Sequence, residues 1–97
     1  MKPAIVRPDA VADIEDAFHW YESERPGLGI TFRREVISTL MRIEEYPQSY
    51  PQVGKGARRA LLQRFPYSVY FRELIDVIAV VACVHNHRDP RVWQSRL

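Results

Sequence analysis

The sequence lacks the features that stabilise small exported domains or carry a chain through a membrane. Cys83 is the only cysteine among 97 residues, so neither an intrachain disulfide nor a cysteine-rich zinc site can form. No apolar run approaches the roughly 18–20 residues that a membrane helix needs, and the first residues become charged too early for a secretion signal. We therefore expect a cytoplasmic protein without membrane contact.

The chain has enough apolar residues for one hydrophobic core and is too short for two. A domain typically contains about 100–150 residues. Hydrophobic residues make up 46% of this sequence and charged residues 27%, a composition richer in core-forming residues than that of disordered chains. We expect a single domain over residues 1–97.

Charge is distributed unevenly along the chain. Residues 1–50 carry 6 basic and 9 acidic side chains, a net charge of −3, whereas residues 51–97 carry 8 and 3, a net charge of +5. Arginine predominates in the second half, and its guanidinium can bind phosphates or a partner's carboxylates in a bidentate manner. When charge is the only observation, an ordinary solvated surface is the simpler explanation.

Two amphipathic segments predict a helical hairpin. A short strand at residues 4–6 precedes Pro8, which suits the first turn of a helix, and Pro26-Gly27 ends that helix. A second periodic segment covers residues 28–46. The apolar stripes consist of Ala10, Val11, Ile14, Ala17, Phe18 and Tyr21 in the first helix, and of Leu28, Phe32, Val36, Leu40 and Ile43 in the second.

The second helix has a further apolar stripe, formed by Ile30, Ile37 and Met41 with Arg34 beside it. Two explanations are open, and we favour the first. Either the helix is sandwiched between its partner helix and a sheet, or the stripe is exposed for another protein chain. Trp20 lies about 120° from the centre of the first helix's stripe, so it is a flanking residue or an exposed anchor for a partner.

Strand patterns follow a loop at residues 48–56. Strands are predicted at residues 58–65, 68–73 and 77–84, and their short connections imply antiparallel pairing. The last run is apolar on both faces, so it should be the central strand. The predicted fold is α+β, a helical hairpin packed on a small antiparallel sheet in the order β-α-α-β-β-β.

The densest polar cluster follows this last strand. His85 and His87 point to the same side if the strand continues, and Arg88 can bind a phosphate, an arrangement compatible with acid–base chemistry. Equally open is a structural strand-end cap, in which His85 bonds backbone and Arg88 pairs with Asp89. A metal site is not favoured, because it needs three or four converging ligands and the remaining histidine, His19, lies elsewhere. We expect no metal and no cofactor.

Two other notable side chains are predicted to be structural. Trp93, near the C-terminus, should anchor the tail onto the core. Cys83 has apolar neighbours on both sides, which predicts an inert buried thiol.

Three segments, in their order and at this chain length, resemble the RelE/ParE superfamily of bacterial toxins, in its ParE-like branch. The segments read VRPDAVADIEDAFHWYESERPGLGITF, RRALLQRFPYSVYF and VVACVHNHRDPRVW. The resemblance implies the toxin half of a type II toxin–antitoxin module. It also implies cytoplasmic residence and a cognate, ParD-like antitoxin whose C-terminal segment wraps the toxin.

The superfamily uses two mechanisms. RelE-like members cut mRNA in the ribosomal A site, whereas ParE-like members bind DNA gyrase and need no hydrolytic groups. Arg88 matches the strand-end arginine of the nucleases. Ser68 stands where they have a middle-strand arginine, and Trp93 lies about where an ionisable tyrosine would be useful, although indole cannot exchange a proton near neutral pH.

The resemblance thus implies a gyrase inhibitor rather than an enzyme. The first alternative is a ribosome-dependent mRNA endoribonuclease, in which His85 or His87 substitutes for the missing groups. The second is a non-toxic interaction module or a decayed toxin.

Site predictions follow from the polar cluster, the apolar stripe and the charges. We expect Arg88 to be the residue most needed for toxicity, with His85 and His87 as secondary candidates. An antitoxin should combine apolar anchors with acidic residues, because charges steer association. Its predicted contacts are Ile30, Ile37, Met41, Trp20, Arg58, Arg59 and Arg64.

Overall fold

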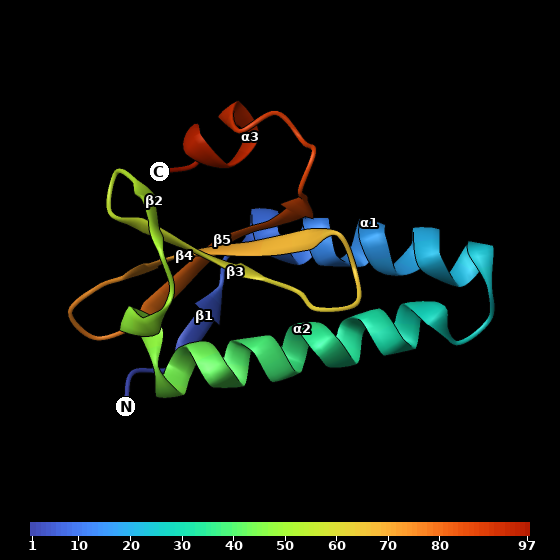
Figure 1. Cartoon of the computed structure of the whole chain (residues 1–97), viewed down its shortest axis with the longest axis horizontal. Helices are drawn as coiled ribbons and strands as arrows, with labels where there is room; N and C mark the ends of the chain where they lie inside the picture. Colours follow the sequence, from blue (N-terminus) through green and yellow to red (C-terminus); the bar gives the residue numbers. More distant parts are fainter.

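A five-stranded sheet separates two long helices from a short C-terminal helix (Figure 1). The structure, a computed structural model, describes all residues from 1 to 97. The elements in chain order are β1 (Ala4–Val6), α1 (Pro8–Glu24), α2 (Leu28–Glu45), the 3-10 helix η1 (Pro47–Ser49), β2 (Gln52–Gly54), β3 (Ala57–Leu61), β4 (Tyr67–Glu73), β5 (Ile78–His85) and α3 (Arg91–Gln94). None of the helices combines the length and the hydropathy needed to cross a bilayer.

The helical hairpin forms where the sequence predicts it. Pro8 occupies the first turn of α1, and Gly27 takes a left-handed conformation with φ of 91° between the helices. The Glu22 carboxylate accepts the backbone N–H groups of Gly27 at 2.9 Å and Gly29 at 2.8 Å, so the end of α1 caps the start of α2. These hydrogen bonds hold the pKa of Glu22 below its usual value.

The strand order is β1-β5-β4-β3-β2, with β5 at the centre of the sheet. All but the last residue of β5 are buried, which confirms the prediction of a central strand covered on both faces. The sheet is mixed rather than wholly antiparallel, because β1 pairs with β5 in the parallel direction. The helical hairpin lies between the first and the later strands in the chain and supplies the long connection that a parallel arrangement needs.

Three details differ from the sequence prediction. β2 lies within the segment predicted as a loop, and β3 ends at Leu61 rather than at residue 65. The chain turns away there because the buried Glu35 carboxylate of α2 accepts the backbone N–H groups of Gln63 and Arg64. The short helix α3 was not predicted either, since its four residues show no helical periodicity.

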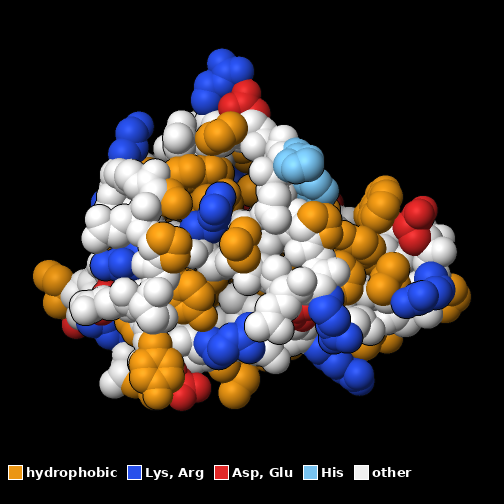
Figure 2. Space-filling model, in the orientation of Figure 1, with side chains coloured by type: hydrophobic (Ala, Val, Ile, Leu, Met, Phe, Trp, Pro, Cys, Tyr) orange, Lys and Arg blue, Asp and Glu red, His pale blue; other side chains and the backbone are white.

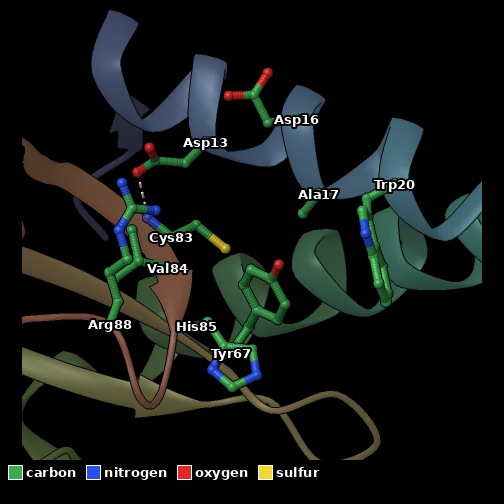
Figure 3. Close-up of a pocket in the computed structure, with 9 residues that line it drawn as sticks. All are labelled: Asp13, Asp16, Ala17, Trp20, Tyr67, Cys83, Val84, His85 and Arg88. Carbon is green, nitrogen blue, oxygen red and sulfur yellow. Dashed lines mark hydrogen bonds between the residues drawn. The ribbon is translucent and has the colours of Figure 1, made fainter.

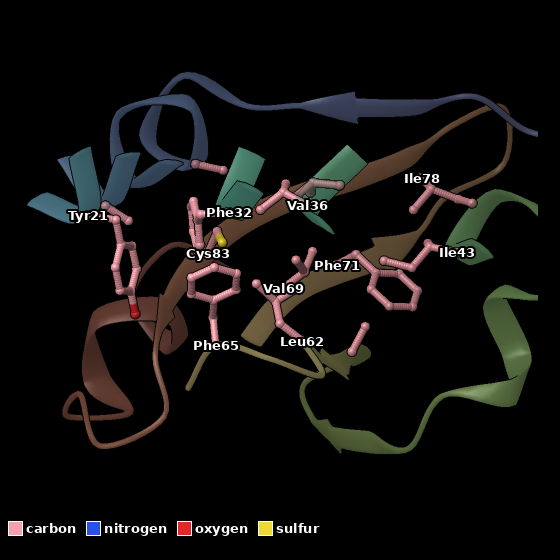
Figure 4. Packing of buried hydrophobic residues seen from close by; sticks show 14 residues of the cluster. Tyr21, Phe32, Val36, Ile43, Leu62, Phe65, Val69, Phe71, Ile78 and Cys83 are labelled. Carbon is pink, nitrogen blue, oxygen red and sulfur yellow. The ribbon is translucent and has the colours of Figure 1, made fainter. Parts of the chain in front are cut away.

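The larger core lies between the sheet and the helical hairpin (Figure 4). Phe32 is fully buried there, and its ring centroid lies 5.2 Å from those of Phe65 and Tyr67 and 5.4 Å from that of Tyr21. Cys83 belongs to the same cluster, which confirms that its thiol is buried, and this burial raises the pKa of the thiol to about 12.

A smaller core lies on the opposite face of the sheet. Trp93 of α3 stacks on Tyr70 of β4, with ring centroids 4.5 Å apart and an angle of 12° between the planes. The prediction that Trp93 anchors the C-terminal tail is therefore confirmed.

The further stripe of α2 is exposed, so the favoured prediction that the fold sandwiches it is wrong. Ile30, Ile37 and Met41 keep 46%, 52% and 58% of their surface accessible. They lie about 100–140° around the helix from Val36, which faces the core. The sheet and α1 cover only the Val36 side, and the explanation that stays open is contact with another protein chain.

Candidate functional site

A groove of about 250 Å³ lies between α1 and the end of β5 (Figure 3). Asp16 and Trp20 line it from α1, while Tyr67, His85 and Arg88 line it from the sheet and the turn that follows β5. The groove therefore brings together Arg88 and His85, two of the three predicted toxicity residues.

Arg88 presents an unpaired guanidinium to this groove. It stands in the turn after β5, where its backbone N–H donates to the carbonyl of His85 at 2.9 Å. The predicted alternative of an Arg88–Asp89 ion pair is wrong. Asp89 instead accepts hydrogen bonds from Arg91, from Nη2 at 2.6 Å and from the backbone N–H at 2.9 Å, and these bonds lower the pKa of Asp89. The Arg88 side chain is thus free to bind a phosphate or a carboxylate.

The two histidines occupy different positions. His85 Nδ1 accepts the backbone N–H of His87 at 3.1 Å, so only Nε2 of His85 remains for a ligand. The His87 ring lies 5.4 Å from the His85 ring but does not line the groove. No set of three or more His, Cys, Asp or Glu side chains converges as a metal site would require.

Tyr67 is a groove residue that the sequence interpretation missed. Its ring lies 5.4 Å from the His85 ring, because the two residues are register partners in the β4–β5 hairpin. Burial is the main cause that raises the pKa of Tyr67, so its hydroxyl is a hydrogen-bond donor at neutral pH. Extending the two predicted strands by one residue each, to 67 and 85, would have identified this pair.

Trp20 lies with the toxicity candidates rather than with the other predicted antitoxin contacts. It is 57% exposed on α1 and lines the same groove as His85 and Arg88. A groove lined by an exposed indole and an unpaired guanidinium has the side-chain types that are enriched at the centres of protein interfaces.

Ser68 supports the turn that carries Arg88. Its side chain is fully buried, and its hydroxyl donates to Asn86 Oδ1 at 2.5 Å. The backbone N–H of Asn86 donates to the carbonyl of Pro66 at 2.8 Å. Ser68 therefore anchors the first residue of the turn after β5 and offers no group to a ligand.

The three arginines predicted to meet an antitoxin do not form one patch. Arg58 and Arg59 are neighbours in β3, so their side chains point to opposite faces of the sheet. Arg58 Nη1 donates to the carbonyl of Tyr50 at 2.6 Å. Arg64 lies in the loop beside α2, where its side chain is 72% exposed and 3.8 Å from the Glu35 carboxylate. Figure 2 shows that lysine and arginine side chains on the visible face of the molecule are scattered rather than gathered in one patch.

Comparisons with known proteins identify the family and the fold of the chain. Residues 4–90 match the model of a family described as the ParE toxin of type II toxin–antitoxin system, parDE. The fold is similar to that of a solved chain from a structure described as the chromosomal ParDE TA system from P. aeruginosa, with a TM-score of 0.79 and 18% sequence identity. This structural match covers 88% of the present chain and 96% of the other. No curated protein sequence matches the chain.

Proposed function

Because this chain belongs to the ParE toxin family of type II toxin–antitoxin systems, we propose that it stops bacterial growth by inhibiting DNA gyrase and that a ParD-like antitoxin neutralises it. The observation that carries this proposal is that one groove between α1 and β5 is lined by both an unpaired arginine, Arg88, and an exposed tryptophan, Trp20. These two side chains offer a target protein a charged and an aromatic contact. The function requires residence in the cytoplasm, where gyrase acts.

The surroundings of Ser68 and Trp93 support inhibition by binding rather than by RNA cleavage. Attack by a ribose 2′-hydroxyl needs a proton acceptor, a proton donor and cations on the phosphate. The Ser68 hydroxyl is held by Asn86, and Trp93 is stacked on Tyr70 in the core on the other side of the sheet. Neither side chain is available to a substrate.

Purified protein tests the proposal directly. We expect it to inhibit supercoiling by gyrase and to leave ribosome-bound mRNA intact. Cleavage of mRNA in the ribosomal A site with gyrase unaffected would overturn the proposal.

That outcome would instead support the RelE-like endoribonuclease as the second candidate. The specific observation in its favour is that His85, Tyr67 and Arg88 line one groove, where they could supply proton transfer and phosphate binding. His85→Ala separates the two candidates. If the protein is an endoribonuclease, the variant should lose RNA cleavage, because the proton-transfer group is gone. If the protein is a gyrase inhibitor, the variant should still inhibit gyrase, because only one contact of the groove with the target is removed.

Arg88→Ala tests the site itself. We expect the variant to fold with an unchanged thermal midpoint and to bind antitoxin, yet to lose growth arrest. The reason is that the Arg88 side chain makes no hydrogen bond or ion pair within the fold. Arg25→Ala, an exposed arginine at the end of α1, is the matched control and should stay toxic. An Arg88→Ala protein as toxic as wild type at equal expression would remove the site assignment.

The α2 stripe is the proposed antitoxin contact. Ile37→Asp should leave the fold intact, because Ile37 is 52% exposed, and should weaken antitoxin binding by about 2 kcal/mol or more by placing a charge in an apolar interface. Ile75→Asp, at an isoleucine 88% exposed in the β4–β5 turn, serves as the control. Antitoxin affinity unchanged by Ile37→Asp would exclude the stripe from the interface.

The same complex should respond to salt. Arg34 and Arg64 are exposed on and beside α2, so acidic residues of an antitoxin would be steered toward them. We expect the association rate to fall as ionic strength rises. A rate indifferent to salt would argue against this electrostatic contribution.

A further inference from the structure

The neighbouring strand covers only the first part of β5 on one edge. β1 pairs with Ile78, Ala79 and Val80, and the backbone N–H of Arg7 then donates to the carbonyl of Val80 at 2.9 Å. Beyond this point the chain turns into α1. The backbone groups of β5 that follow Val80 on this edge therefore have no strand to pair with.

Two side chains take the hydrogen-bonding positions that a longer β1 would occupy. Asp13 Oδ2 accepts the backbone N–H of Cys83 at 3.0 Å, the contact drawn in Figure 3, and Arg96 Nη1 donates to the carbonyl of Val81 at 3.0 Å. The two side chains also bind each other, Nη1 to Oδ2 at 2.6 Å and Nη2 to Oδ1 at 3.2 Å. An ion pair thus continues the sheet edge where β1 stops.

This ion pair also closes the C-terminal segment into a loop. Residues 86–97 leave β5 after His85, carry Arg88 and α3, and return to β5 through Arg96. Asn86 fixes the start of the segment and Trp93 fixes its middle. Arg96 is the charged anchor at its end, and its partner Asp13 also lines the groove that Arg88 enters.

We propose that Asp13 and Arg96 are positioning residues, which hold the C-terminal segment so that Arg88 projects into the α1–β5 groove. The claim that this position matters for toxicity rests on the proposed function of Arg88. The claim that the ion pair holds the C-terminal segment in place does not depend on that function. The side chains are only 13% and 19% exposed, so the pair is poorly screened by solvent, and removal of either partner leaves a sparsely solvated charge and an unpaired backbone group.

Hydrogen exchange gives the direct test, because the Cys83 amide reports on the Asp13 contact itself. In Asp13→Ala and Arg96→Ala we expect exchange at Cys83 and in residues 86–97 to rise at least about tenfold, equivalent to about 1.4 kcal/mol of local opening. Amides of α2 around Val36 should be unchanged. Glu15→Ala, which breaks the more exposed ion pair of α1 with Arg33 at 3.1 Å, is the matched control and should leave Cys83 protected.

Growth arrest and antitoxin binding complete the test. We expect both alanine variants to lose toxicity while binding antitoxin as wild type does, because the α2 stripe does not contact the pair. Asp13→Asn should restore part of the Cys83 protection and part of the toxicity, since its amide oxygen can still accept the Cys83 N–H. A variant that merely destabilised the whole protein would raise exchange in α2 as well.

The outcomes separate this inference from the proposed function. Unchanged exchange at Cys83 and in residues 86–97 would overturn the positioning role, whatever the toxicity. Increased local exchange with toxicity retained would show that the segment's position is irrelevant to growth arrest and would also overturn the role. If Arg88→Ala stays toxic, the proposed site fails while the exchange result still stands.

Discussion

The two faces of the sheet are covered by very different amounts of protein. On one face, α1 and α2 contribute to a cluster of 14 buried residues, whereas on the other face α3 and the tail contribute to a cluster of 6. The first cluster contains a group of aromatic rings around Phe32, and the second depends on the single stack of Trp93 on Tyr70. Stability should therefore be concentrated on the hairpin side, while the thinly covered side carries the segment with Arg88.

Truncating Phe32 should have the largest effect on stability. Phe32→Ala removes a ring that is fully buried against Phe65, Tyr67 and Tyr21, so we expect a loss of about 3–5 kcal/mol in the free energy of unfolding. Urea denaturation measures it. A loss below about 1 kcal/mol would mean that the hairpin side does not dominate stability.

Trp93→Ala should cost about 3 kcal/mol, at the low end of the range for a buried aromatic residue, although the side chain removed is larger. Trp93 lies in the smaller cluster near the end of the chain, where the tail can detach without opening the sheet. Hydrogen exchange should therefore increase in residues 86–97 first. Loss of protection throughout α2 at the same time would show that the two faces are equally important.

Gly29→Ala should separate α1 from α2 by a small distance. An added Cβ would lie 2.5 Å from the carbonyl oxygen of Phe18, so the helices must move apart, at a cost of about 1–2 kcal/mol. Thermal denaturation gives the measurement, and Ser38→Ala, on the exposed side of α2, is the control. An unchanged midpoint for Gly29→Ala would mean that the hairpin tolerates a wider spacing.

The smallest effect concerns Cys83 and appears only at alkaline pH. Burial raises the pKa of its thiol from 9.0 to about 12, so the folded state keeps a proton that the unfolded state loses. The free energy of unfolding therefore keeps its full value below pH 9 and decreases as the pH rises toward about 12. The slope of this decrease is at most about 1.4 kcal/mol per pH unit. Unfolding free energies of wild type and Cys83→Ala at pH 8 and pH 10 should converge at the higher pH. If the difference in unfolding free energy between wild type and Cys83→Ala is the same at both pH values, the raised pKa of Cys83 is refuted.

Local patterns in the sequence were sufficient for most of the fold. The apolar period of the two helices, the break at Pro26-Gly27 and the continuous apolar run of β5 all predicted elements that the structure confirms. β2 was not predicted, because its three residues are too few to show an alternation of apolar and polar side chains and they lie in a segment rich in glycine and proline. The parallel pairing of β1 with β5 depends on how the chain between these two strands crosses the sheet, and no local sequence pattern predicts that path.

The candidate site was less predictable because its parts are distant in the sequence. His85 and Arg88 stood out as polar residues after an apolar strand, but their neighbour Tyr67 depends on strand register. The Asp13–Arg96 contact joins residues 83 positions apart, and neither residue has a distinctive neighbourhood in the sequence. Only the three-dimensional arrangement brings them together at the edge of β5.

The position of β5 has a consequence for how the protein is made. The centre of the sheet is the last strand to leave the ribosome, and its partner β1 is the first. Until residues 78–85 are available, the apolar sides of α1 and α2 have no sheet centre to cover, although the hairpin can form from contacts close in sequence. All residues up to the end of β5 must be synthesised before the larger core closes. The nascent protein therefore cannot assemble the groove between α1 and β5 until β5 and the turn that carries Arg88 have left the ribosome.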